Sequence, residues 1–179
     1  FKKEIKSLRK EPKNKLIDYL GWHKQNEKYC FVGLPLLSGR LFGEKKSLIR
    51  EIVKKYNLDL RLTPNQDILL CNISNKHKIH IKKALLKIGY DNLNEINEIQ
   101  RHALACPALP LCGLAMTEAE RILPTVLTRI DDLIKSLNIK KSILFRMTGC
   151  PNGCTRPYMA ELALVGSGQN KYQLWLGGS

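Results

Sequence analysis

Four cysteines in the second half of the chain lie in two pairs, and both pairs sit in short runs that contain proline. Cys106 and Cys112 occur in the run CPALPLC, and Cys150 and Cys154 occur in the run CPNGC. Thiolates bind iron–sulfur clusters and zinc, and they form disulfides in oxidising compartments. Proline fixes one backbone angle and the pair Asn152–Gly153 readily takes positive φ, so the second pair is expected on a tight, kinked turn.

The spacing leaves several interpretations of these four thiols open. Five residues separate the first two cysteines, which is more than a usual zinc knuckle contains. No secretory signal is visible, which argues against disulfides. A cluster of iron and sulfur held by the two loops fits best, and a zinc site or unrelated buried thiols are the alternatives. The other two cysteines, Cys30 and Cys71, lie in apolar strand-like runs and are predicted to be buried and inert.

The pattern of apolar and polar residues predicts two α+β modules that carry these cysteines. Residues 21–92 show the order strand, helix, strand, strand, helix, which is close to a ferredoxin-like unit. Residues 101–179 hold both cysteine motifs, and a polar connector at 91–100 separates the two modules. Residues 1–20 form a basic N-terminal segment.

Local signals place the elements of the first module. Apolar residues at helical spacing predict helices over 45–57 and 77–90. Alternating residues on both sides of a turn predict a bent hairpin over 58–73, and a further strand is expected within 27–42.

The second module is expected to contain one long helix and three strands. Thr117 and Glu120 fit a capping box that begins a helix, and Pro124 then breaks or restarts it. The predicted strands lie at 142–149, 160–166 and 172–178.

The composition is that of a globular protein with a large excess of positive charge. Hydrophobic residues make up 44% of the chain and charged residues 26%, and the formal net charge is +14. This surplus predicts an acidic partner, either a nucleic acid or an acidic protein, unless it reflects only a composition rich in Lys, Asn and Ile. No apolar run reaches the roughly 18 residues that a membrane helix needs.

Longer runs around these motifs resemble the sulfite and nitrite reductases that contain sirohaem and a 4Fe–4S cluster. The cysteine-bearing runs at 102–124 and 146–179 carry the more specific resemblance, and 21–41 and 60–70 are similar to that family's ferredoxin-like half-domain. The form CPALPLC is typical of sulfite reductases, and the ferredoxin-dependent enzymes of cyanobacteria and plastids are the most similar. The chain is therefore expected to be a fragment from the C-terminal half of such an enzyme, truncated at its C-terminus.

The resemblance implies an α+β fold with a ferredoxin-like half-domain followed by an iron–sulfur and sirohaem-binding domain. The implied activity is the six-electron reduction of sulfite to sulfide, with reduced ferredoxin as the electron donor. Cys106, Cys112, Cys150 and Cys154 would ligate the 4Fe–4S cluster. Cys154 would also bridge to the sirohaem iron, which makes it the catalytic candidate.

Contacts to the sirohaem itself are expected from four further residues. Arg61, Asn65 and Gln66 offer a cation and amide donors that suit the carboxylates of the macrocycle, and Asn152 lies in the second cysteine turn. The cations that bind sulfite are expected outside this fragment, which is expected to be inactive when isolated.

Two other functions stay open at this point. Ferredoxin-dependent nitrite reduction uses the same cofactors. A basic nucleic-acid-binding module with a structural four-cysteine metal site would also explain the positive charge. The expected compartment is the plastid stroma or the cyanobacterial cytoplasm, with no membrane association.

Overall fold

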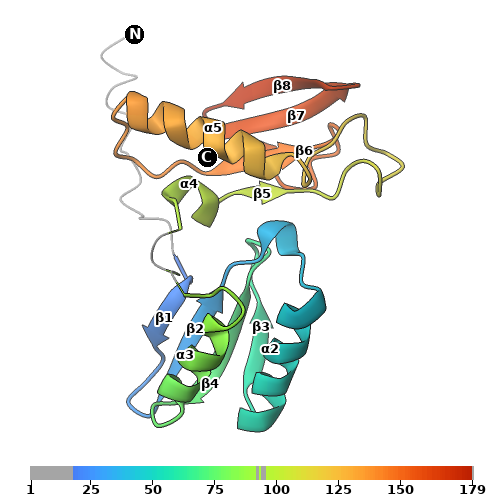
Figure 1. Cartoon of the computed structure of the whole chain (residues 1–179). Helices are drawn as coiled ribbons and strands as arrows, with labels where there is room; N and C mark the ends of the chain where they lie inside the picture. Colours follow the sequence, from blue (N-terminus) through green and yellow to red (C-terminus); the bar gives the residue numbers. More distant parts are fainter. Residues whose placement is uncertain (1–17, 92, 94–95, 179) are drawn as a thin grey trace.

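The computed structural model shows two α+β modules, each with its own four-stranded sheet and its own hydrophobic core (Figure 1). Residues 18–91, 93 and 96–178 are described. The basic segment predicted for residues 1–20 therefore lies almost entirely outside the described residues. None of the described helices is long and apolar enough to cross a membrane.

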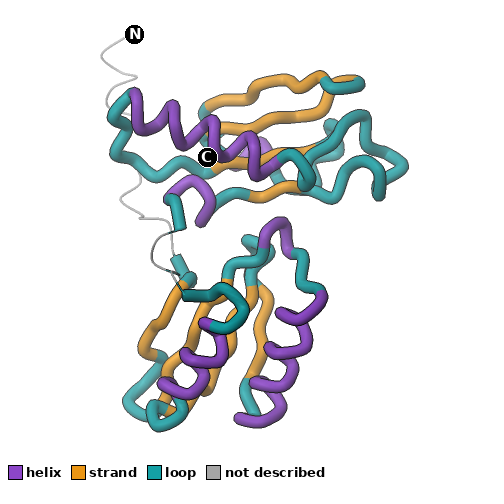
Figure 2. The backbone as a smooth tube through the Cα atoms, in the orientation of Figure 1, coloured by secondary structure: helices purple, strands orange, loops and turns teal. Residues whose placement is uncertain are grey.

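The first module is an antiparallel sheet of order β1-β2-β4-β3 with helices α2 and α3 on one face (Figure 2). The predicted helices and hairpin are confirmed, but β1 was missed because it is a short edge strand with a polar half. Its elements are β1 (Gly21–Lys24), β2 (Tyr29–Leu34), the 3-10 turn η1 (Leu37–Gly39), α2 (Gly43–Tyr56), β3 (Asp59–Leu62), β4 (Ile68–Ser74) and α3 (Lys78–Leu86).

Helix α2 is held to this sheet by one apolar stripe. Ile49 and Ile52 are buried in the first core, and Leu48 and Val53 pack against it. Residues three and four apart lie on the same side of a helix, which is why this spacing predicted the helix correctly. The helix ends at Asn57, whose φ of 49° is the left-handed conformation common at helix ends.

The second module has a mixed sheet of order β5-β6-β7-β8, in which only the β7–β8 pair is antiparallel. The three predicted strands are confirmed as β6, β7 and β8, whereas β5 has two residues and left no pattern to detect. Its elements are α4 (Glu98–Arg101), β5 (Leu104–Ala105), α5 (Leu123–Ser136), β6 (Phe145–Thr148), the 3-10 turn η2 (Pro157–Met159), β7 (Leu162–Gly168) and β8 (Lys171–Leu176).

The predicted capping box is wrong, because the long helix begins later. Helix α5 starts at Leu123 with Pro124 in its first turn, where a missing backbone N–H costs nothing. The Thr117 side chain is buried, and its hydroxyl donates to the Tyr172 hydroxyl at 2.9 Å. A tertiary contact with β8 therefore uses the hydroxyl that the local sequence pattern assigned to a helix cap.

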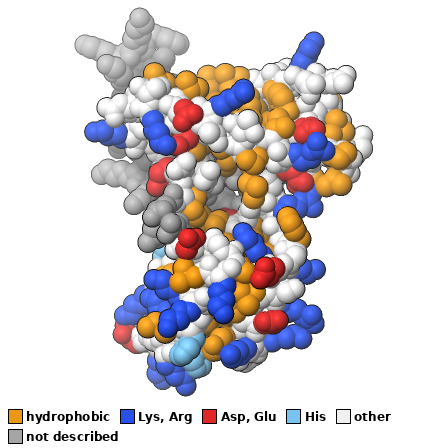
Figure 3. All heavy atoms as spheres, in the orientation of Figure 1, with side chains coloured by type: hydrophobic (Ala, Val, Ile, Leu, Met, Phe, Trp, Pro, Cys, Tyr) orange, Lys and Arg blue, Asp and Glu red, His pale blue; other side chains and the backbone are white. Residues whose placement is uncertain are grey.

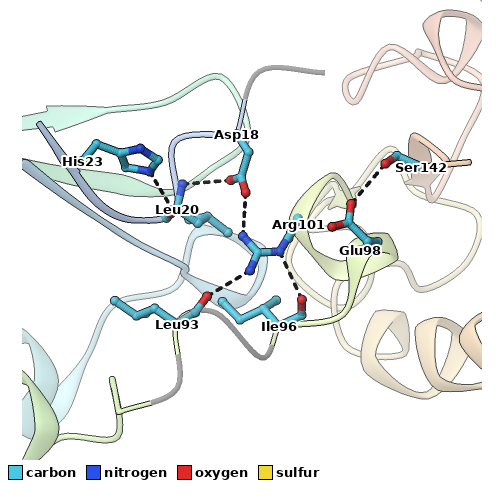
Figure 4. Close-up of polar contacts among 8 residues, drawn as sticks. All are labelled: Asp18, Leu20, His23, Leu93, Ile96, Glu98, Arg101 and Ser142. Atoms are coloured by element: carbon cyan, nitrogen blue, oxygen red, sulfur yellow. Dashed lines mark hydrogen bonds and ion pairs between the residues drawn. The ribbon is translucent and has the colours of Figure 1, made fainter. Parts of the chain in front are cut away.

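Arg101 ties the connector to the start of the first module (Figure 4). Its guanidinium lies 2.6 Å from the Asp18 carboxylate and donates to the carbonyls of Leu93 and Ile96, both at 3.1 Å. The Arg101 side chain is only 10% exposed, so these carbonyl acceptors and the carboxylate compensate for its burial.

Asp67 is a buried carboxyl at the beginning of β4. Its Oδ1 accepts a hydrogen bond from the Leu36 backbone N–H at 2.9 Å. Burial raises the pKa of Asp67 to about 6, against a lowering by that hydrogen bond and a further small rise from the nearby Asp18 carboxylate. The folded chain therefore holds a proton on Asp67 that the unfolded chain releases at lower pH.

We expect this carboxyl to weaken the fold as the pH rises from about 4 to about 7. A raised pKa in the folded state means that its stabilising effect is present below the unfolded pKa and is lost through the folded pKa. Asp67→Asn should flatten this dependence, with a difference in unfolding free energy on the order of 2–3 kcal/mol across the window. Urea unfolding at both pH values measures it.

The exposed Asp59 provides the matched control. Asp59→Asn should leave the pH dependence of the unfolding free energy like that of the unchanged chain. If Asp67→Asn behaves in the same way as Asp59→Asn, Asp67 does not titrate as described.

Candidate metal centre

The two cysteine motifs lie on loops that follow adjacent parallel strands. Cys106 directly follows β5, and Cys150 lies two residues after β6. Because β5 and β6 are parallel, their carboxyl ends meet at one edge of the sheet, and the two loops leave from that edge. Figure 2 shows the first of them as a long loop that projects past the sheet.

Backbone hydrogen bonds join the two loops directly. The Gly149 carbonyl, just before Cys150, accepts from the N–H groups of Met116 at 2.8 Å and Thr117 at 3.2 Å. The Cys106 N–H donates to the Met147 carbonyl at 3.2 Å. The sheet and these bonds therefore bring together two motifs that are distant in the sequence.

Gly149 allows this approach because it has no side chain. A Cβ at Gly149 would lie 2.6 Å from the Ala108 Cβ and 2.7 Å from the Thr117 carbonyl oxygen. Gly166 of β7 lies directly against Gly149, and a Cβ at Gly166 would lie 2.3 Å from the Gly149 carbonyl oxygen. Any larger residue at Gly149 would push the two loops apart.

The Cys106 sulfur sits in a polar niche made by the second loop. The Gly149 N–H donates to this sulfur at 3.3 Å, and the Thr148 hydroxyl lies 3.6 Å from it. The same hydroxyl donates to the Cys150 carbonyl at 3.1 Å. The contacts from Gly149 and Thr148 hold the Cys106 sulfur against the second loop.

The four cysteines differ in exposure. Cys106 and Cys150 are buried at 8% and 6% exposure, Cys112 is half-buried, and Cys154 is exposed. Cys30 and Cys71 are buried as predicted, and burial raises the pKa of both thiols.

The donor set and the joined loops fit a four-thiolate cluster, and Cys154 is the sulfur most open to a second metal. Within the described part of the chain, however, no three His, Cys, Asp or Glu side chains gather closely enough to hold a metal ion. The structure thus brings the loops together without bringing the sulfurs into a metal-binding arrangement.

The turns within the loops use left-handed backbone conformations. Gly153 has a φ of 71° and Arg156 a φ of 57°, and the Arg156 N–H closes the turn on the Gly153 carbonyl at 2.7 Å. The expected kinked turn is therefore present, with Asn152 exposed on it. In the first loop, the N–H groups of Leu111 and Cys112 both donate to the Ala108 carbonyl.

The candidates from the first module have separate surroundings. The Gln66 side chain reaches the second module and donates to the Ala105 carbonyl at 3.0 Å, next to Cys106. Asn65 lines a cleft of about 500 Å³ between the modules. Arg61 lies on the edge strand β3 with a side chain that is 65% exposed, and its guanidinium is 4.0 Å from Asp59. Only Gln66 is brought into contact with a cysteine-bearing segment by a described hydrogen bond.

The sequence analysis did not identify Arg146, a buried residue of β6 that contacts the segment before the first cysteine motif. It is 5% exposed, and its guanidinium donates to the carbonyls of His102 and Phe145. Burial, together with a smaller effect of the nearby Arg156 charge, lowers the pKa of Arg146 to about 10. A single cation inside the apolar run of β6 was the signal that could have indicated it.

Known proteins match both the first module and the whole chain. Residues 23–88 match the family described as the nitrite/sulfite reductase ferredoxin-like half domain. The chain is 48% identical to the sulfite reductase (ferredoxin) of Synechococcus elongatus, covering 100% of this chain and 30% of that protein. It is 38% identical to the sulfite reductase (NADPH) hemoprotein beta-component of Staphylococcus carnosus, covering 90% and 29%.

A solved structure shares the fold. The structure of the Mycobacterium tuberculosis NirA protein superposes with a TM-score of 0.73 at 20% identity, covering 93% of this chain and 32% of that one. This shared fold agrees with the sequence matches to nitrite and sulfite reductases.

Residues 23–88 therefore carry the ferredoxin-like half domain of nitrite and sulfite reductases. The chain is similar along its whole length to part of a ferredoxin-type sulfite reductase, and it spans about 30% of the length of the curated relatives it matches.

We predict that Gly149→Ala separates the two cysteine loops, because its Cβ has no space. The unfolding free energy should fall by about 1–3 kcal/mol, as for other overpacked sites, when measured by urea denaturation. Gly113→Ala is the matched control, since a Cβ at this neighbouring loop glycine meets no atom within 4 Å. Equal stability of the two variants would contradict the close approach of the loops.

Proposed function

We propose that this chain is the part of a ferredoxin-dependent sulfite reductase that carries the iron–sulfur cluster and one side of the sirohaem pocket. The observation that supports it most is the 48% identity along the whole chain to a protein named sulfite reductase (ferredoxin). The two cysteine loops are hydrogen-bonded to each other at Gly149. This contact also supports the proposal, because a cluster with four thiolate ligands needs both motifs in one place.

The cysteines have distinct roles in this proposal. Cys106, Cys112, Cys150 and Cys154 are the cluster ligands, and the burial of Cys106 and Cys150 keeps water away from that side. Cys154 is exposed, and its second role would be to help hold the sirohaem. When bound, the cluster and sirohaem would supply single-electron transfer and an iron site for sulfite.

The remaining candidates are assigned to contacts with the sirohaem or with the protein beside it. Asn152 lies on the exposed turn between Cys150 and Cys154, and Asn65 lines the cleft between the modules. Arg61 contributes a cation for a cofactor carboxylate from β3. Gln66 would act indirectly, through the hydrogen bond that its side chain donates to the Ala105 carbonyl.

Sulfite is favoured over nitrite as the substrate. The relatives described above from Synechococcus elongatus and Staphylococcus carnosus are both named sulfite reductases. A nucleic-acid-binding module is the less favoured class, because it gives no reason for the similarity to these enzymes. The cyanobacterial relative supports a cyanobacterial-type enzyme, and the plastid stroma stays a prediction.

The charge of the first module suits an acidic electron donor. Lys and Arg side chains gather over this module in Figure 3. Helices α2 and α3 carry eight of them. Ferredoxins are acidic proteins, so this surface would draw them in by long-range attraction. The exposed cations of the two helices are Lys45, Lys46, Arg50, Lys54, Lys55, Lys78, Lys82 and Lys83.

Anaerobic reconstitution of this chain with ferrous iron and sulfide tests the cofactor part of the proposal. We expect about four irons per chain and the absorption and EPR signals of a 4Fe–4S cluster. Cys150→Ser should remove most of this iron. Cys71→Ser should not, because Cys71 lies in β4 of the other module.

Binding of one zinc and no iron would contradict the proposal and favour a structural metal site. With the complete enzyme that contains this chain, sulfite should be reduced faster than nitrite under the same electron donor. The reverse preference would assign the chain to a nitrite reductase.

We also predict that raising the ionic strength slows electron transfer from ferredoxin to the complete enzyme. Salt screens attraction between exposed charges over roughly 8–10 Å at physiological concentrations. Stopped-flow reduction at increasing salt measures the rate. A rate that does not change with salt would exclude a charge-steered encounter.

A further inference from the structure

The first module contacts the backbone that carries Cys106 from two directions. We call these contacts the module interface; it consists of Arg40 and Gln66 of the first module and Ala105 and Glu120 of the second. Arg40 binds both oxygens of the Glu120 carboxylate through Nε and Nη2, at 2.8 to 3.2 Å. The Glu120 side chain is only 11% exposed, so this two-pronged pair is shielded from water on the acid side.

Both ends of the module interface lead to Cys106. The Glu120 N–H donates to the Cys106 carbonyl at 3.2 Å, and the Gln66 amide donates to the carbonyl of Ala105 at 3.0 Å. Cys106 follows a strand of only two residues, β5, which pairs with β6 alone. Its position therefore depends on contacts from outside its own strand.

The backbone turns of the first module that carry Arg40 and Gln66 adopt unfavourable left-handed conformations. Gln66 has a φ of 66° and Ser38 a φ of 50°, which are unusual for residues with a side chain. The two turns also interlock, because a Cβ at Gly39 would lie 3.2 Å from the Gln66 Cβ. Strained turns persist where the surrounding structure holds them, and here they present the two contacting side chains.

Unpaired polar atoms mark the same turns. The Ser38 hydroxyl and the Gln66 Oε1 are buried without a hydrogen-bond partner within the described part of the chain. A buried polar atom without a partner is unfavourable. These two atoms therefore make an unfavourable contribution to the stability of the same turns.

We propose that Arg40 and Gln66 are positioning residues that hold Cys106 in place for cluster binding. They touch neither metal nor substrate; they act through Glu120 and Ala105. The ferredoxin-like half domain would then take part directly in assembling the metal centre of the second module. This inference rests on the proposed function for its metal, but the placement of Cys106 can be measured without one.

Alkylation of the metal-free chain tests the placement. Each cysteine reacts with iodoacetamide at a rate that mass spectrometry resolves by residue. In Arg40→Ala and in Gln66→Asn, Cys106 should react about tenfold faster, the factor expected when one such hydrogen bond is lost. Asparagine tolerates the left-handed backbone at Gln66 but is too short to reach Ala105.

Internal and matched controls separate local release from unfolding. Cys71 and Cys150 are also buried and should keep their rates, whereas unfolding would raise all of them. Arg129→Ala removes an exposed cation from α5 and should change nothing. Arg40→Lys keeps the charge but loses the two-pronged geometry, so its Cys106 rate should lie between those of Arg40→Ala and the unchanged chain.

A second readout uses the reconstituted chain. Iron loss to a chelator should be about tenfold faster in Arg40→Ala and Gln66→Asn than in Arg129→Ala. Unchanged Cys106 alkylation in both variants would overturn the inference. If the unchanged chain takes up no iron, the proposed function fails while the alkylation result still decides the positioning role.

Discussion

The Gly149 carbonyl is the point on which the arrangement of the cysteines depends. It accepts two backbone hydrogen bonds from the first loop while standing directly before Cys150 of the second. These bonds are possible only because Gly149 and Gly166 have no side chains where three backbone segments meet. A Cβ at that point would keep the two cysteine loops from meeting as they do here.

The first module also helps to fix the position of the first cysteine loop. Gln66 donates directly to the Ala105 carbonyl. Arg40 binds the Glu120 side chain, and the Glu120 N–H donates to the Cys106 carbonyl within the second module. Arg146 holds the same segment from within the second module, through the His102 carbonyl. The first module, which carries the positive surface, is therefore hydrogen-bonded to the segment that contains Cys106.

The four cysteines of the two motifs differ in their exposure to solvent. Cys106 and Cys150 are enclosed by the loops, and Cys154 faces outward on a turn closed by Arg156. This gradient suits a centre that is protected on one side and open to a second cofactor on the other.

Local chemistry made much of this molecule readable from sequence. The spacing of Ile49 and Ile52 predicted α2, and the alternation around Pro64 predicted the β3–β4 hairpin. That the paired cysteine motifs form one cofactor site stays a prediction. The helix and hairpin signals are local because helix faces, strand faces and turns repeat over a few residues. Thr117 was misread for the same reason: its sequence neighbours fit a helix cap, but its hydroxyl binds Tyr172, 55 residues away. The tertiary structure alone decided that Arg40 meets Glu120 and that Gln66 meets Ala105, because long-range pairs leave no periodic pattern in the chain.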